Sequence, residues 1–199
     1  MLLCVLFSNA QKKIEKTLAL DKDISAVVFD LEHVFSIKLK STKNSKVTIR
    51  AISEGEYANH FVVTEKSIGN LMTVYGRVAF TFPNNQDKLS AHKVHAIAIE
   101  ITVPERLKTT LNSDIGNLNA TGFYEQLTAN FKSGTCMLNQ ASGHFVIQTI
   151  NGNISLTAKN AQVISETRTG LVTQQQLIDG RSMFKLKTIK GNINIEQSK

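Results

Sequence analysis

The sequence predicts an all-β protein whose second half, residues 107–199, winds into a β-solenoid of 18-residue rungs. Gly116, Gly134, Gly152 and Gly170 are each 18 residues apart, and Gly191 follows after 21. On both sides of each glycine, apolar residues alternate with polar ones, as in a strand with one buried face. A single rung of this kind cannot bury its apolar face alone, so the repeat predicts a stack of rungs.

Each repeat places a glycine corner between two short apolar columns. We expect positive φ angles at the corners, since glycine alone adopts them at little cost. The predicted turn glycines are Gly116, Gly134, Gly152, Gly170 and Gly191. The predicted inward core ladder is Leu127, Phe145, Val163 and Phe184 before the corner, and Leu118, Ile154, Val172 and Ile193 after it.

The fourth repeat departs from this pattern. Gln174 stands where the other repeats carry an apolar residue, and three additional residues precede the fifth repeat. We expect these residues to bulge near Asp179 and Gly180, where a loop can grow without disturbing the stack. The alternative to a solenoid is an antiparallel sandwich with regularly spaced hairpins.

Residues 24–104 predict irregular strands that cap one end of the stack. The clearest alternation is Ile97, Ile99, Ile101 and Val103, which ends at Pro104. The polar stretch 83–90 reads as an exposed loop. No Gly/Ser/Pro-rich linker separates the halves, so we expect residues 11–199 to form a single domain.

Residues 1–10, MLLCVLFSNA, predict a signal peptide that is cleaved after Ala10. The segment lacks a basic start, so a buried first strand is the alternative. Cys4 follows Leu3, which is too bulky for the usual lipoprotein signal. The run is also much shorter than the roughly 20 apolar residues that cross a bilayer. An exported protein with no transmembrane helix is therefore expected.

The formal charge of +7 raises the question of a nucleic-acid partner. Basic residues such as Lys38, Lys40 and Arg50 alternate with apolar ones, as on the solvated face of a strand. No dense basic patch is interleaved with aromatic residues, so we expect no nucleic-acid binding. A general attraction to anionic glycans or membrane surfaces stays open.

No catalytic, cofactor or metal signature emerges from the repeat. If consecutive repeats stack in order, Asp114 shares a column with Lys132, and Glu166 with Asn112, Asn130 and Gln148; no column gathers two acids. His92 and His95 are close in sequence but lack a third metal ligand. The sequence therefore predicts a protein that is not an enzyme and that holds no cofactor.

The segment Ile101-Thr102-Val103-Pro104, followed by repeats such as residues 147–156 and 186–195, resembles the putative-adhesin family of bacterial domains of unknown function. The resemblance covers residues 24–199. It implies a right-handed parallel β-helix, a fold likened to autotransporter adhesin heads, and a location in the periplasm, on the outer membrane or outside the cell.

We expect the chain to be an exported adhesin-like protein. It would present stacked polar strand faces to a glycan or a surface protein. Self-association is a further option. Two alternatives stay open: a structural component of the cell envelope, and a polysaccharide-active β-helix enzyme.

Overall fold

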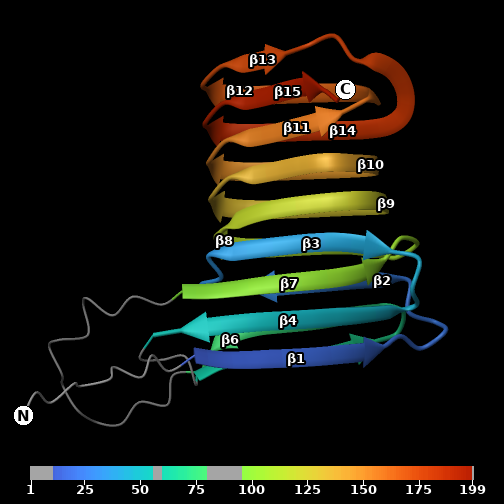
Figure 1. The fold of residues 1–199 in the computed structure, drawn as a ribbon, viewed down its shortest axis with the longest axis vertical. Helices are drawn as coiled ribbons and strands as arrows, with labels where there is room; N and C mark the ends of the chain where they lie inside the picture. Colours follow the sequence, from blue (N-terminus) through green and yellow to red (C-terminus); the bar gives the residue numbers. More distant parts are fainter. Residues whose placement is uncertain (1–10, 56–59, 80–95, 199) are drawn as a thin grey trace, which may run out of the picture.

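The computed structural model describes residues 11–55, 60–79 and 96–198, and these residues form one mixed, open β-sheet that folds into two facing layers (Figure 1). We call the series that starts at β1 layer A. Its order is β1 (Gln11–Ala19), β4 (Lys46–Glu54), β7 (Ala96–Pro104), β3 (Ser36–Thr42), the first part of β9 (Asn117–Ser133) and of β10 (Cys136–Asn151), β11 (Ile154–Ala158), β15 (Ile193–Gln197) and β13 (Val172–Gln174).

The series behind it is layer B. Its order is β5 (Phe61–Ile68), β6 (Leu71–Val78), β2 (Ala26–Leu31), β8 (Lys108–Ile115), the second part of β9 and of β10, β14 (Ile178–Lys190) and β12 (Asn160–Thr169). Apolar side chains from both layers meet in a single buried core. The protein is thus all-β over its described residues, as the alternation predicts.

Strands β9 and β10 pass from layer A to layer B, so each contributes to both. They pair in parallel, with Leu118 beside Cys136 and Leu127 beside Phe145. Cys136 in turn lies beside Ile154. These partners are the residues that the 18-residue repeat aligns.

The last two repeats do not stack in chain order, which corrects the simple order assumed from the sequence. Phe145 of the third repeat pairs with Phe184 of the fifth, and Val163 of the fourth pairs with the other side of Phe184. In layer A, Ile193 likewise lies between Ile154 and Val172. The fifth repeat therefore fills the space between the third and the fourth, and the fourth forms the end of the stack (Figure 1).

This order explains the unusual composition of the fourth repeat. Its inward positions include Ser165, Thr167 and Gln174, which suit the terminal repeat of the stack, because this repeat packs against the core on one side only. Val163 and Val172, which we expected in the core, also lie in this terminal repeat and are incompletely buried. Val163 is half-buried and Val172 is 42% exposed. The other predicted ladder residues are buried: Leu127, Phe145, Phe184, Leu118, Ile154 and Ile193.

The additional residues of the fourth repeat lie where the alignment places them. Asn160 pairs with Ile178, but the next residue, Ala161, pairs with Ser182. The register therefore shifts across the segment that contains Asp179 and Gly180, and from Ala161 and Ser182 onward it stays constant.

The predicted turn glycines line one corner of the stack, where successive coils approach closely. Their φ angles run from 132° at Gly134 to 158° at Gly170. A Cβ atom at Gly134 would overlap the carbonyl oxygen of Gly116, and one at Gly152 would overlap that of Gly134. Lack of space, more than the φ angle alone, therefore requires glycine at this corner.

The first half is more irregular, as expected, but it also contains parallel pairs. Strand β2 lies between β6 and β8, and β3 lies between β7 and β9, so this segment continues the parallel stack. Strands β1, β4 and β5 instead pair with their neighbours antiparallel. At the end of the stack formed by β1 and β5, the ammonium groups of Lys12 and Lys16 donate to the carbonyl oxygens of Phe61 and Val63 on edge strand β5. Such lysines oppose further strand pairing.

Aromatic rings fill the middle of the core. The rings of Phe145 and Phe184 stack with centroids 4.7 Å apart, and Tyr124 meets Phe145 edge-on at 5.5 Å. The buried Tyr124 hydroxyl donates towards the carbonyl oxygens of Leu39 and Thr121, at 3.0 and 3.1 Å. The hydroxyl thus links strand β9 to strand β3.

Several sequence predictions fall outside the described residues: the signal peptide at 1–10 with Cys4, the polar loop at 83–90, and the pair His92 and His95. None of the described segments forms a helix with the length and apolarity needed to cross a membrane.

Candidate ligand groove

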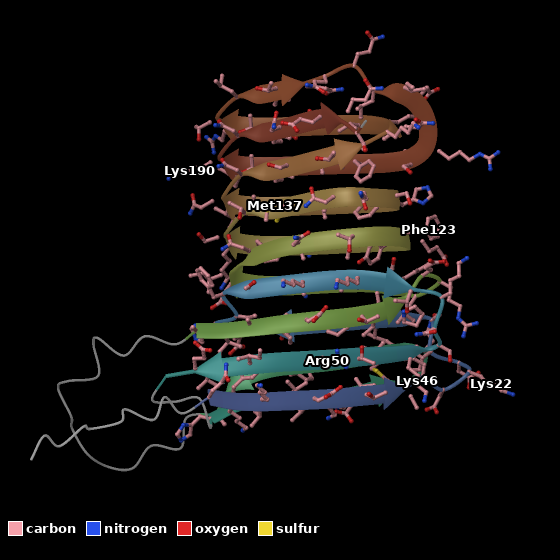
Figure 2. The ribbon with its side chains drawn as sticks, in the orientation of Figure 1. Lys22, Lys46, Arg50, Phe123, Met137 and Lys190 are labelled. Carbon is pink, nitrogen blue, oxygen red and sulfur yellow. The ribbon has the colours of Figure 1, made fainter. Side chains whose placement is uncertain are left out.

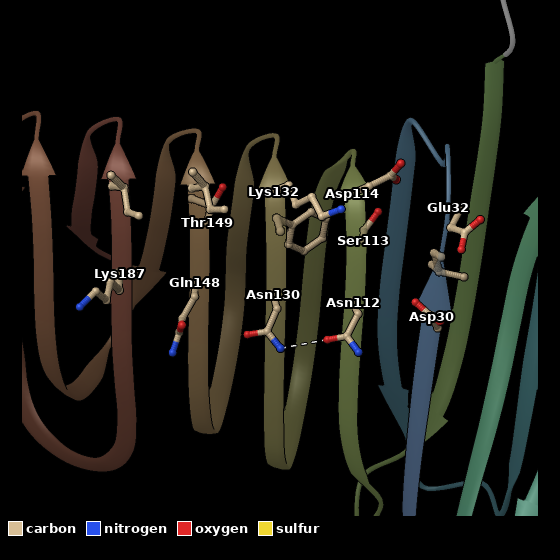
Figure 3. Close-up of a pocket in the computed structure, with 14 residues that line it drawn as sticks. Asp30, Glu32, Asn112, Ser113, Asp114, Asn130, Lys132, Gln148, Thr149 and Lys187 are labelled. Atoms are coloured by element: carbon tan, nitrogen blue, oxygen red, sulfur yellow. Dashed lines mark hydrogen bonds between the residues drawn. The ribbon is translucent and has the colours of Figure 1, made fainter.

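A groove of about 440 Å³ crosses the outer face of layer B. Its walls come from β2, β8, β9, β10 and β14, which are neighbours in the stack, and from Glu32 just after β2 (Figure 3). The parallel strands keep their register across the layer. Each strand therefore contributes one outward side chain to each row of side chains that crosses the layer. The groove therefore runs perpendicular to the strands.

A row of carboxamides occupies the middle of the groove. Asn112 on β8, Asn130 on β9 and Gln148 on β10 are register partners of one another. The Nδ2 of Asn130 donates to the Oδ1 of Asn112 at 2.9 Å (Figure 3). The amide of Gln148 makes no hydrogen bond within the described part of the chain, and it faces the groove with its donor and acceptor free.

Charged residues extend the row at both ends. Asp30 pairs with Asn112 in register, and Lys187 pairs with Gln148. The Arg77 guanidinium lies 3.0 Å from the Asp30 carboxylate and 3.4 Å from that of Glu32. Lys187 lies 3.1 Å from Glu166 on the terminal strand β12.

A second row runs beside the first and begins at Asp114. The Asp114 Oδ1 accepts the backbone N–H groups of His33 and Ile115, at 3.0 and 2.8 Å. The Lys132 side chain points towards Asp114 (Figure 3). Ile150 and Ile189 follow, and Ile150 is 47% exposed. The groove thus has an acidic end, an amide middle and an apolar strip.

The wall at the glycine corner contains a buried hydroxyl without a partner. In the terminal coils, the Thr188 hydroxyl donates to the carbonyl oxygen of Gly152, and that of Thr167 to Gly191, both at 2.9 Å. The Thr149 hydroxyl holds the same column position but has no hydrogen-bond partner among the described residues. It lies beside the Phe131 ring, which takes that position one coil earlier.

The carboxylates at the acidic end correct the expectation that no column gathers two acids. The repeats alone place no two acids in one column, but β2 inserts beside β8 and adds Asp30 and Glu32 next to Asp114. Sequence reasoning missed these two acids because β2 lies outside the repeats. The column of amides, in contrast, follows from the 18-residue spacing.

The acids of the groove already have ion-pair or hydrogen-bond partners within the protein. Asp30 and Glu32 share Arg77, and Asp114 accepts two backbone N–H groups. Across the described ranges, no three His, Cys, Asp or Glu side chains gather in a way that could hold a metal ion. Cys136 is buried in the core, and burial raises the pKa of its thiol to about 12. A thiol with this pKa is protonated at neutral pH and is a poor nucleophile.

The outer face of layer A has a different character, because its charges alternate along a row. Arg50, labelled in Figure 2, lies 3.0 Å from Glu15 on β1 and beside Glu100 on β7. Lys40 on β3 lies 2.9 Å from Glu100, and this hydrogen bond is the main reason that the pKa of Glu100 is lowered. These ion pairs link neighbouring strands of layer A on its solvated outer face.

The structure places the sequence-predicted turn glycines and ladder residues outside the groove. The five glycines lie at a corner of the stack, and the apolar ladder faces inward between the layers. These residues position the groove by holding the register of its strands. Among the described residues that line it, the functional candidates are instead the outward polar side chains.

Comparison with solved structures supports the fold. A structure described as a "putative cell adhesion protein" from Clostridium sporogenes matches with a TM-score of 0.60 and 11% identity, over 94% of this chain and all of that one. A "putative adhesin" from Bacteroides fragilis matches with a TM-score of 0.40 and 11% identity, over 94% of this chain and 97% of that one. At this identity, the first match shows a shared fold alone. No family model and no curated protein matches the chain.

Proposed function

We propose that the chain is an exported, non-enzymatic, adhesin-like surface protein that binds its ligand in the layer B groove. The observation that carries this proposal is the groove itself, which crosses five adjacent strands and presents polar side chains in register. We infer further that the repeats form a right-handed parallel β-solenoid, as the resemblance to adhesin-like domains implies.

Two other features support export and adhesion. Residues 1–10 have the apolar run and the small residues before Gln11 that signal peptidases recognise. The Clostridium protein with the same fold is described as a "putative cell adhesion protein". A stacked sheet also suits adhesion, because its rigid face holds contact groups in place before the ligand arrives.

The arrangement of the acids argues against a hydrolase. A glycoside hydrolase needs two carboxyl groups on opposite sides of the scissile bond, and one must be able to donate a proton. Asp30 and Glu32 lie on the same strand end and share one guanidinium, and Asp114 is committed to backbone N–H groups. These contacts favour a binding role for the groove.

Self-assembly as an envelope component is a second candidate, supported by the terminal coil. Ile164 on β12 is 61% exposed, and Leu171 is 73% exposed. Strands β12 and β13 are both edge strands among the described elements. Unlike the end that Lys12 and Lys16 cover, this end leaves apolar side chains and backbone groups accessible to a second copy.

A binding panel separates these functions. Purified protein would be applied to immobilised polysaccharides and matrix proteins, and retention and polymer chain length would both be measured. The proposal predicts retention without shortening, and weaker retention of Gln148→Leu but not of Asn119→Leu, which removes a carboxamide from the outer face of layer A. Shortening of a polymer would contradict the non-enzymatic role. Concentration-dependent oligomers without retention would favour self-assembly.

A further inference from the structure

We propose that the ligand of the layer B groove is a neutral polysaccharide, whose extended chain lies across the strands of layer B. This inference rests on the proposed function and specifies its ligand class. It also departs from what the net charge of +7 suggests, namely an attraction to anionic polymers.

The local charge of the groove is the first argument. Three carboxylates line it, on Asp30, Glu32 and Asp114, and the two cations that line it are Lys132 and Lys187. Arg77 already pairs with Asp30 and Glu32, and Lys187 pairs with Glu166. An anionic polymer would have to displace such pairs and approach a surface with more carboxylates than cations, so its binding is disfavoured.

The free hydrogen-bonding groups are the second argument. Asn130 donates one N–H to Asn112 and keeps its Oδ1 and a second N–H available, while Gln148 keeps its whole amide. A carboxamide both donates and accepts hydrogen bonds, and a sugar hydroxyl does the same. Adjacent amides on adjacent strands can therefore pair with successive hydroxyl groups without any change of charge.

The apolar strip beside the amides is the third argument. Ile150 is substantially exposed on an outer strand face and continues to Ile189 in the same row. A pyranose ring has an apolar face of C–H groups as well as a rim of hydroxyls. The amide row and the isoleucine strip, side by side, match these two parts of a sugar.

The geometry of the stack sets the direction of the polymer. Neighbouring strands lie about 4.8 Å apart, which is comparable to the length of one sugar unit in an extended β-linked chain. A polymer that crosses β8, β9 and β10 would therefore meet Asn112, Asn130 and Gln148 in turn. A chain that runs along a strand would meet only one of these amides.

Affinity electrophoresis of the full chain can test the proposal. Gels would contain a neutral β-glucan, xylan or mannan, or an anionic polygalacturonate or alginate, each at low and at high salt. We expect retardation by at least one neutral polymer and no comparable retardation by the anionic ones. The retardation should be unaffected by salt, because no ion pairs form. Gln148→Leu should weaken it about fivefold, as expected for one lost uncharged hydrogen bond.

Two controls separate structural damage from loss of the site. Asn119→Leu removes a carboxamide from the outer face of layer A and should leave retardation unaltered. Gln148→Asn keeps an amide and should retain more affinity than Gln148→Leu. Neutral-polymer binding that Gln148→Leu leaves unchanged would overturn the proposal.

The same gels distinguish failure of this inference from failure of the proposed function. Salt-sensitive retardation by anionic polymers alone, or retention on matrix proteins alone, would overturn the neutral-polysaccharide proposal but leave an adhesin-like function standing. Absence of retention on every polymer and protein of the panel would overturn both.

Discussion

Phe145 stacks on Phe184, 39 residues further along the chain, with ring centroids 4.7 Å apart. An 18-residue repeat stacked in chain order would instead put Val163 beside Phe145. The last repeat thus enters between the third and fourth, and the fourth closes the stack. The groove depends on this order, since it brings Lys187 of the last repeat beside Gln148.

Disulfide trapping tests the order of the repeats. Ser155 and Asn194 are register partners on the outer face of layer A, whereas Ser155 and Thr173 are separated by β15. In a Cys4→Ser background, we expect S155C/N194C to form a disulfide under mild oxidation. S155C/T173C should not, because residues two strands apart, about 10 Å, exceed disulfide reach. The opposite result, read by gel mobility and mass, would show repeats stacked in chain order.

Substitution of Gly152 tests the close approach at the glycine corner. A Cβ at Gly152 would overlap the Gly134 carbonyl oxygen, whereas one at Gly69, with φ of 58°, would meet nothing within 4 Å. Gly69→Ala should therefore cost only the strain of a positive φ, about 1 kcal/mol. Gly152→Ala should cost about 2–4 kcal/mol, because the coils must separate. Equal free energies of unfolding in urea would refute the steric explanation.

The acid titration of Glu100 tests the charged row on layer A. Its hydrogen bond to Lys40 lowers the pKa of Glu100, so this pair contributes stability above the carboxyl group's usual pKa of 4.5. That contribution is lost as the pH falls through the lowered value. Lys40→Met should raise the pKa of Glu100, measured by NMR titration, and should cost less than about 1 kcal/mol because the pair is exposed. An unchanged titration would mean that Lys40 does not hold Glu100.

Alkaline titration of Cys136 tests the burial of the central column. Burial raises the pKa of this thiol from 9.0 to about 12. Below pH 9 the thiol is neutral in both the folded and the unfolded chain and does not affect the pH dependence. Between pH 9 and 12 the Cys136 thiol ionises only in the unfolded chain, so its contribution should lower stability as the pH rises.

Thiol labelling gives a second measure of the same burial. In a Cys4→Ser chain, a disulfide reagent at pH 8 should modify Cys136 at least about a hundredfold more slowly in buffer than in urea. Rapid labelling of the folded protein would contradict the burial of the column formed by Leu118, Cys136 and Ile154.

The repeat predicted much of this structure, because its period fixes which residues are equivalent. Leu118, Cys136 and Ile154 lie in one buried column, as the 18-residue spacing predicts. Equivalence does not specify order in space, however, and Val172 was expected in the core but lies on the terminal coil. Gln174 carried the missing signal: a polar inward residue is costly inside a stack but acceptable at its end.

The groove was only partly predictable for a related reason. Asn112, Asn130 and Gln148 align by the repeat, so the amide row could be found from the sequence. Asp30 could not, because β2 lies far from the repeats in sequence and has no glycine corner to align it. Its place beside Asn112 depends on long-range strand pairing, which local patterns do not encode.

NMR titration of the side-chain amides shows whether the layer B groove is the ligand site. A soluble neutral β-glucan would be added to the ¹⁵N-labelled protein, and the amide signals of Asn112, Asn130 and Gln148 would be compared with those of Asn119 and Asn194 on layer A. If the ligand lies in the groove, the first three signals should shift saturably and the layer A pair should not move. Saturable shifts confined to layer A would contradict this placement, and so would binding that leaves all three groove amides unperturbed.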